Sequence, residues 1–164
     1  MERRIVLSWF GLIILAAPTI AGSAAAANQV PFQGTLEGSF TASQDPPPAI
    51  NRVLNAAGRS TLLGNFTYYF PHSVDRSVMP ATGVGVSTFS AANGDEVRAS
   101  ISGEATLVAP GVLLVVEQGT ILGGSGRFEG ASGSFVIERL IDTVNLTTAG
   151  SFKGTISSPG AGNP

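Results

Sequence analysis

The chain has 164 residues, with 9 basic and 11 acidic side chains, one His and no Cys. Its formal net charge of −2 offers no electrostatic attraction to nucleic acid or to an anionic membrane surface. Without Cys it can form neither disulfides nor a cysteine-ligated metal site, and its one His is too few for a metal site built on histidines.

Residues 1–27 have the three parts of a secretory signal peptide. Arg3 and Arg4 precede an apolar run over residues 5–20, and small residues follow, ending in four alanines at 24–27. A membrane-spanning helix would need roughly 20 predominantly apolar residues. This run is shorter and contains Pro18, so we expect cleavage after Ala26 or Ala27. The mature protein is then secreted or periplasmic, with no membrane attachment.

After the signal peptide, apolar and polar residues alternate with a period of two, which is typical of half-buried strands. Proline or glycine clusters separate these runs, and Asn93-Gly94 is a strong hairpin signal. A longer loop is expected over residues 71–82, where Pro71 and Pro80 interrupt the pattern. The predicted strands are 32–40, 50–55, 62–70, 83–90, 96–106, 112–121, 134–142 and 151–157.

Short connections between successive strands favour antiparallel pairing. Eight such strands can close on themselves, which removes both exposed edges of the sheet. We therefore predict an all-β, eight-stranded antiparallel barrel as a single domain over residues 28–158, followed by a disordered tail over 159–164. The alternative architecture is a two-sheet sandwich.

Residues 123–133 read GGSGRFEGASG and lie between two predicted strands. Glycine adopts positive φ readily and lets backbones approach closely. The segment therefore predicts a tightly packed turn or a bulged crossing within the sheet, rather than a linker. Its structural glycines are Gly123, Gly124, Gly126, Gly130 and Gly133.

This glycine segment resembles one shared by the allene oxide cyclase and dirigent group of β-barrels, as do residues 115–117 and 152–156. The mature chain also resembles small exported bacterial proteins of unassigned function, through residues 32–35, 92–95 and 154–157. The resemblance implies an eight-stranded barrel with an apolar cavity, sometimes oligomeric, without metal or organic cofactor. Cyclases of this group direct ring closure of an unstable fatty-acid epoxide, and dirigent proteins direct phenoxy-radical coupling. It carries over no catalytic residue.

Few side chains stand out as candidates for chemistry. His72 falls in the predicted loop, and we interpret it as a solvated loop residue. The serines lack the Gly-x-Ser-x-Gly elbow of a hydrolase. Adjacent strand residues face opposite sides, so either Glu138 or Arg139 should point into the barrel. A buried carboxylate opposite a guanidinium would anchor a ligand in an apolar cavity, whereas the simpler alternative leaves Glu138 and Arg139 in water.

Aromatic side chains at inward positions either line a cavity or fill the core, and core filling is the commoner outcome. We expect non-catalytic binding of a small apolar molecule, or an extracytoplasmic structural role. The alternative is a cofactor-free isomerase or steering protein of the allene oxide cyclase or dirigent type. No catalytic residue, metal or cofactor is assigned, and a homo-oligomer is compatible with the sequence. The candidate cavity-lining residues are Phe66, Tyr68, Phe70, Glu117, Phe135, Glu138 and Arg139.

Overall fold

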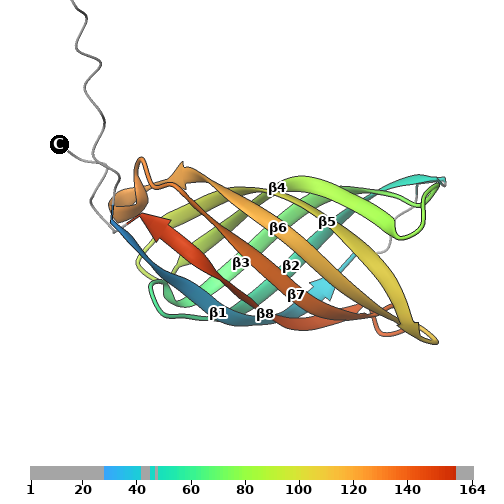
Figure 1. Ribbon diagram of the computed structural model, residues 1–164. Helices are drawn as coiled ribbons and strands as arrows, with labels where there is room; N and C mark the ends of the chain where they lie inside the picture. Colours follow the sequence, from blue (N-terminus) through green and yellow to red (C-terminus); the bar gives the residue numbers. More distant parts are fainter. Residues whose placement is uncertain (1–27, 42–44, 47, 158–164) are drawn as a thin grey trace, which may run out of the picture.

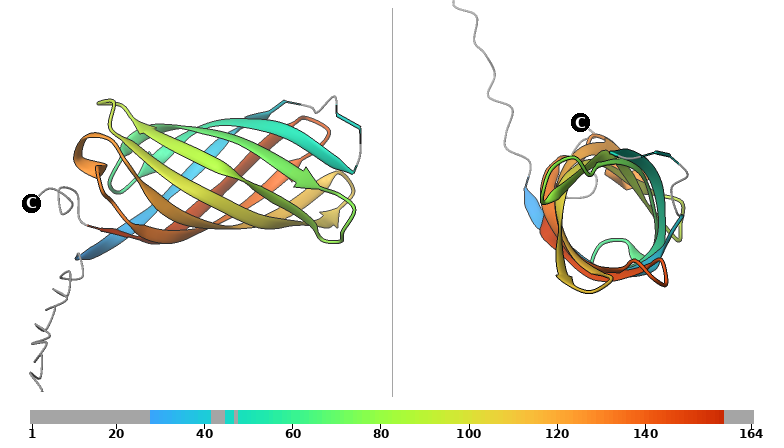
Figure 2. Two further views of the ribbon diagram at one scale, coloured as in Figure 1. Left: turned by 90° about the horizontal axis from the view of Figure 1, so that it is seen from above. Right: turned by 90° about the vertical axis from the view of Figure 1, so that its right-hand side faces the viewer.

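A computed structural model describes residues 28–41, 45–46 and 48–157. Eight antiparallel strands form a closed barrel in which each strand pairs with its neighbours in sequence and β8 pairs with β1 (Figures 1 and 2). The predicted barrel is confirmed, and the sandwich alternative is wrong. The predicted signal peptide and the tail over 159–164 lie outside the described residues. The strands are β1 (Gln29–Phe40), β2 (Ala49–Ser60), β3 (Gly64–Asp75), β4 (Ala81–Ala91), β5 (Glu96–Ala109), β6 (Val112–Gly124), β7 (Gly133–Asp142) and β8 (Thr147–Ser157).

Most predicted strands differ from the observed ones by a few residues, and the ends of β2 and β3 differ most. β2 runs to Ser60, beyond the predicted range 50–55, and β3 continues through Pro71 to Asp75. The expected loop over 71–82 is therefore much shorter. Proline has no N–H to donate to a ladder, and the β3–β4 pairing accordingly passes from Tyr69 to His72 without pairing the two residues between them. β3 nevertheless continues because its other edge pairs with β2 throughout.

The glycine segment forms the connection between β6 and β7 and covers one end of the barrel (Figure 1). It contains the short 3₁₀ helix η1 (Gly126–Phe128), whose Phe128 side chain is fully buried. Gly126 has φ +60°, and a Cβ there would meet the carboxylate of Asp95 in the β4–β5 turn. Arg127 Nε donates to that same carboxylate at 2.8 Å. The predicted tight glycine turn is confirmed, and it fastens this end of the barrel to the neighbouring hairpin.

Aromatic rings fill the half of the barrel next to η1. Phe89 lies at the centre of this cluster, and its ring centroid is 4.6–5.6 Å from those of five neighbours. The edge-to-face and tilted arrangements are those that aromatic pairs prefer. This half is a packed core that leaves the other half to provide any site. The five neighbours of Phe89 are Phe32, Phe66, Tyr68, Phe135 and Phe152.

No helix in the described ranges has the length and apolarity needed to cross a bilayer.

Candidate functional site

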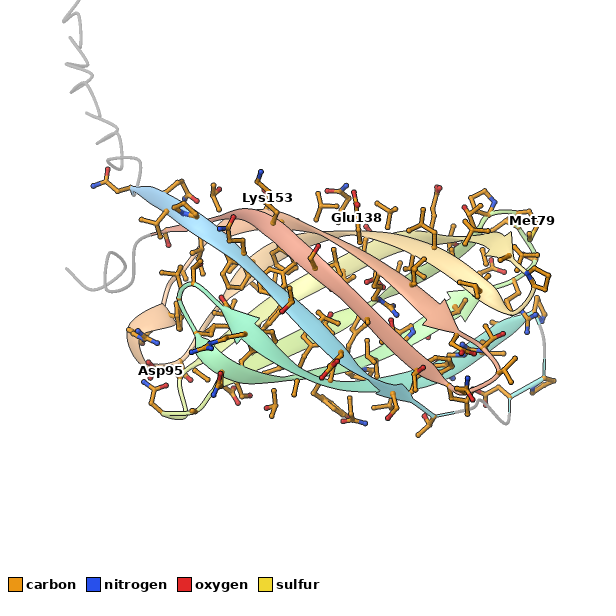
Figure 3. All side chains as sticks on the ribbon, turned by 90° about the horizontal axis from the view of Figure 1, so that it is seen from below. Met79, Asp95, Glu138 and Lys153 are labelled. Atoms are coloured by element: carbon orange, nitrogen blue, oxygen red, sulfur yellow. The ribbon has the colours of Figure 1, made fainter. Side chains whose placement is uncertain are left out.

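The half of the barrel away from η1 contains a cavity of about 390 Å³, which we call the end cavity. It opens at the end marked by Met79 in Figure 3, opposite the end marked by Asp95. Inward-facing residues of several strands form the apolar walls of the end cavity. Charged side chains lie at its inner end and around its opening. The apolar walls include Ile50, Val74, Ala105, Leu113, Val115 and Ile141.

A buried ion pair lies on the inner wall of the end cavity. Arg139 of β7 donates from Nε to Glu117 Oε2 at 3.0 Å and from Nη2 to Glu117 Oε1 at 2.8 Å. The exposed fractions of Glu117 and Arg139 are only 5% and 4%. Two parallel hydrogen bonds of this kind fix both the position and the plane of the carboxylate. Arg139 Nη1 also lies 3.4 Å from Thr148 Oγ1, which donates to the Leu140 carbonyl oxygen at 2.7 Å.

Two glycines make room for this pair. Gly103 is paired with Glu117 in the β5–β6 ladder, and Gly150 with Arg139 in the β7–β8 ladder. A Cβ at Gly103 would lie 2.5 Å from Glu117 Cγ, and one at Gly150 would lie 2.5 Å from Arg139 Cβ. The long side chains of Glu117 and Arg139 can therefore point inward, because the glycines paired with them have no side chain to occupy that space.

Arg52 and His72 form a second polar group of the end cavity, and they are direct partners in the β2–β3 ladder. The guanidinium of Arg52 lies over the Phe40 ring at 5.0 Å, and its Nε is buried without a hydrogen-bond partner in the described structure. The His72 ring stacks on Phe70 at 4.4 Å and 11°, with Nδ1 3.0 Å from the Phe70 carbonyl oxygen. Since a carbonyl only accepts, this nitrogen carries the proton.

The end cavity changes the acid–base behaviour of the groups around it. Burial lowers the pKa of His72, and the charges of Arg139 and Arg52 lower it further. Burial also lowers the pKa of Arg52, helped by repulsion from Arg76 and Arg139. Deeper in the barrel, burial and the negative charge of Glu117 raise the pKa of Tyr68. Arg52 and Tyr68 therefore sense the opposite charges of the ion pair, which solvent screens little inside the barrel.

Comparison with solved structures gives the fold a name. The chain matches the structure of the pterocarpan synthase dirigent protein GePTS1 with a TM-score of 0.56 and 12% sequence identity, over 87% of this chain and 96% of that one. This barrel has the dirigent fold. No protein-family model matches the chain, and no curated protein does either. At this identity the likeness extends to the fold alone, and what the site does has to be argued from its own residues.

The dirigent-fold barrel places the sequence-predicted site residues in three environments. Glu117 and Arg139 line the end cavity, and Arg139 is the member of its pair that points inward. Glu138 is exposed on the outer wall (Figure 3), so it does not reach the end cavity. The expectation that Arg139 lies in water is wrong. The four aromatic candidates, Phe66, Tyr68, Phe70 and Phe135, are buried in the packed core.

The interpretation of His72 as a solvated loop residue is also wrong, because it lies in β3 with its ring stacked and half-buried. Sequence reasoning missed Arg52 as well. A signal for Arg52 was present, since it has the same parity as the inward residues Ile50, Leu54 and Ala56 of β2.

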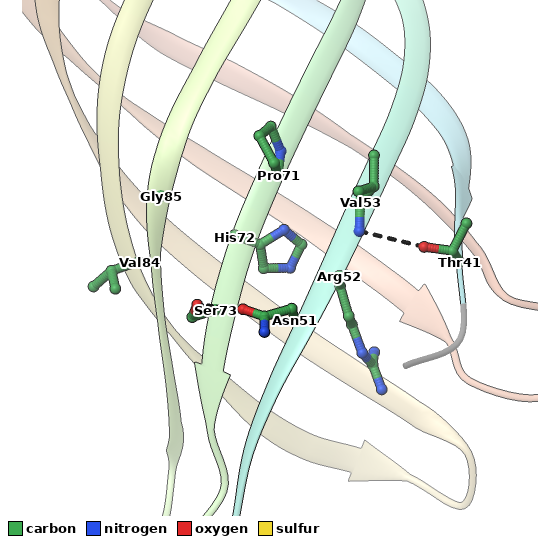
Figure 4. A pocket seen from close by; sticks show the side chains of 9 residues that line it. All are labelled: Thr41, Asn51, Arg52, Val53, Pro71, His72, Ser73, Val84 and Gly85. Carbon is green, nitrogen blue, oxygen red and sulfur yellow. Dashed lines mark hydrogen bonds between the residues drawn. The ribbon is translucent and has the colours of Figure 1, made fainter. Parts of the chain in front are cut away.

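A shallower hollow of about 370 Å³ lies over β2, β3 and β4 and shares Arg52 and His72 with the end cavity (Figure 4). Most of its other lining residues, such as Asn51 and Ser73, occupy outward strand positions, and Ser73 Oγ donates to Asn51 Oδ1 at 2.7 Å. We regard the end cavity as the candidate site because it lies inside the barrel and contains buried charged groups, as ligand sites generally do.

Proposed function

We propose that this barrel is a binding protein for a small, largely apolar molecule that enters at the open end and lies in the end cavity. The observation that supports the proposal is a cavity of about 390 Å³ with apolar walls and a few fixed polar groups. Ligand sites are typically concave, mostly apolar and about 300–1,000 Å³ in volume. A purely structural role has less support, since such a protein needs no unfilled interior.

The test is a thermal-shift screen of the full mature chain with fatty acids, fatty alcohols and phenolic compounds. A ligand at about one hundred times its dissociation constant should raise the melting temperature by on the order of 5–10 °C. Ala105→Phe would fill the end cavity and should abolish the shift. Thr106→Phe is the matched control, because Thr106 is the next residue of β5 and is exposed. Equal shifts in both variants would place the ligand elsewhere, and no shift with any compound would refute the proposal.

A second candidate function is cofactor-free steering of a reactive apolar substrate to one product, and the Glu117–Arg139 pair favours it. A fixed, buried carboxylate and guanidinium can stabilise charge that develops in a bound substrate. One protein with this fold is named as a pterocarpan synthase dirigent protein. Chiral chromatography of phenoxy-radical coupling products, or of the ring product of an unstable fatty-acid epoxide, tests this function. Glu117→Gln should then abolish an enantiomeric excess seen with the wild-type protein, and racemic product from the wild-type protein would refute steering of these substrates.

We further propose that the protein is exported and that cleavage after Ala26 or Ala27 releases the intact barrel. β1 begins at Gln29, so cleavage at either position leaves every strand complete. N-terminal sequencing of the protein from the periplasm or medium should begin at Ala27 or Asn28. A cytoplasmic protein that retains Met1 would contradict export.

A further inference from the structure

The charged residues around the end cavity are unevenly distributed. Arg139 is neutralised by Glu117, since they form a bidentate ion pair. The two other arginines that line the cavity are Arg52 on β2 and Arg76 just after β3, and both lie on its β2–β3 side. The other carboxylate among the lining residues is Glu104, which is exposed on β5. Among the residues that line the cavity, its β2–β3 side therefore carries two arginines and no carboxylate.

Arg52 is held in one orientation for contact with the cavity. Its guanidinium rests on the Phe40 ring at 5.0 Å, a cation–π arrangement that fixes the plane of the group. Its Nε is buried and has no hydrogen-bond partner in the described part of the chain. A buried donor without an acceptor destabilises the protein, and a donor on a charged group does so most strongly. Arg52 lines the end cavity, so a ligand held there lies beside a guanidinium whose hydrogen-bonding capacity is not fully used.

The surroundings of Arg52 favour a negatively charged acceptor over a neutral one. Arg76 lies close enough to repel the Arg52 charge, and so does Arg139 despite its pairing with Glu117. His72, its ladder partner, directs its Nδ1 proton to the Phe70 carbonyl, so that proton is not available to a ligand. The planar guanidinium fork matches a carboxylate better than it matches a single hydroxyl.

We propose that the ligand of the end cavity carries a carboxylate and that Arg52 binds this group while the apolar part contacts the walls. This inference rests on the proposed binding function and specifies the class of ligand. The class is an amphipathic monocarboxylate, with either an alkyl or an aryl body.

The experiment measures binding to the mature chain by isothermal titration calorimetry, with two matched pairs of compounds. Decanoate and 1-decanol represent an alkyl body, and 3-phenylpropanoate and 3-phenylpropanol an aryl body. Each acid should bind about tenfold or more tightly than its alcohol, because a charged hydrogen bond is lost in the alcohol. The pair of compounds that binds more tightly shows whether the apolar part of the ligand is alkyl or aryl.

Arg52→Met keeps an apolar stem over Phe40 and removes the charge, and it should lower the affinity for the acid to that for the alcohol. Arg59→Met is the matched control, since Arg59 is an exposed residue of the same strand, and it should leave both affinities unchanged. Arg52→Lys serves as a second variant if Arg52→Met does not fold; it should retain part of the preference, because the charge remains without the fork.

Binding of acids and alcohols with equal affinity would refute the anionic group but leave the binding function intact. Preference for acids that survives Arg52→Met would show that another residue holds the carboxylate. If none of the four compounds bound and the wider screen were also negative, the binding function itself would fail.

Discussion

Gly103 and Gly83 face each other across the β4–β5 ladder, yet a side chain would meet different surroundings at the two positions. A Cβ at Gly103 would lie 2.5 Å from Glu117 Cγ and 2.8 Å from Glu117 Cα. The first contacts of a Cβ at Gly83 would be at 3.7 and 3.9 Å, which is ordinary van der Waals distance. Of the two glycines, only Gly103 is therefore required to leave room for the buried Glu117 side chain.

Alanine substitution at the two positions tests this difference. Gly103→Ala should lower the free energy of unfolding by about 1–3 kcal/mol, because the extra methyl overlaps backbone and Glu117 atoms. Gly83→Ala should be neutral or stabilise by up to about 1 kcal/mol, since alanine restricts the unfolded chain more than glycine does. Urea unfolding followed by circular dichroism measures both. Equal losses of stability would contradict the requirement for space at Glu117.

The buried ion pair predicts a non-additive response to mutation. Removing one partner leaves a buried charge without compensation, so Glu117→Gln and Arg139→Met should each cost about 3–5 kcal/mol. The double variant should cost less than the sum of the two, because no charge is left unpaired. Chemical unfolding of the four proteins gives the coupling energy.

Glu138→Gln is the control for that cycle, because Glu138 precedes Arg139 but is exposed. It should change the free energy of unfolding by no more than about 0.5 kcal/mol. Additive single effects would mean that Glu117 and Arg139 act independently, contrary to their bidentate geometry.

The barrel could be predicted because its signals are local. Alternation with a period of two gives strand faces, and Asn93-Gly94 marks a turn that the structure places between β4 and β5. The end of β3 could not be predicted, because Pro71 removes a donor that only one of its two neighbouring strands needs. Tertiary pairing decides which neighbouring strand would have needed the missing N–H. The sequence around Pro71 does not contain this information.

The candidate site was only half predictable for a similar reason. Strand parity indicates that one of Glu138 and Arg139 faces inward, but it does not identify the partner on another strand. Glu117 is the partner because the register of β6 and β7 brings it beside Arg139, and register is a long-range property. Arg52 has inward parity too, but parity alone does not show that a charged side chain on that face is buried.

His72 predicts a pH-dependent contribution to stability. Its pKa is lowered below the usual 6.5, chiefly by burial. The unfolded chain therefore binds a proton more readily than the folded protein, and stability is complete above about pH 6.5. Below that pH it should fall, by up to about 1.4 kcal/mol per pH unit, until the folded-state pKa is passed. Urea unfolding between pH 4.5 and 7.5 measures the slope.

His72→Gln should remove this slope without removing the acid unfolding at lower pH. Hydrogen bonds from turn residues lower the pKa values of Asp75, Asp95 and Asp142, so their contribution is lost only below about pH 3.8. The loss due to His72 therefore begins near pH 6.5, and the loss due to these carboxylates begins near pH 3.8. A wild-type slope that persists in His72→Gln would assign the titration to another group.

The aromatic half of the barrel should determine most of its stability, and Phe89 is the residue that tests this most directly. Its ring contacts five others, and its side chain is fully buried, so Phe89→Ala leaves a cavity that rigid β-strands cannot close. The expected loss is about 3–5 kcal/mol in the free energy of unfolding. Tyr69→Ala, an equally large truncation at an exposed position of β3, should cost less than about 1 kcal/mol. Comparable losses in the two variants would show that the ring cluster around Phe89 is not the principal core, and the division of the barrel into a packed half and a binding half would have to be abandoned.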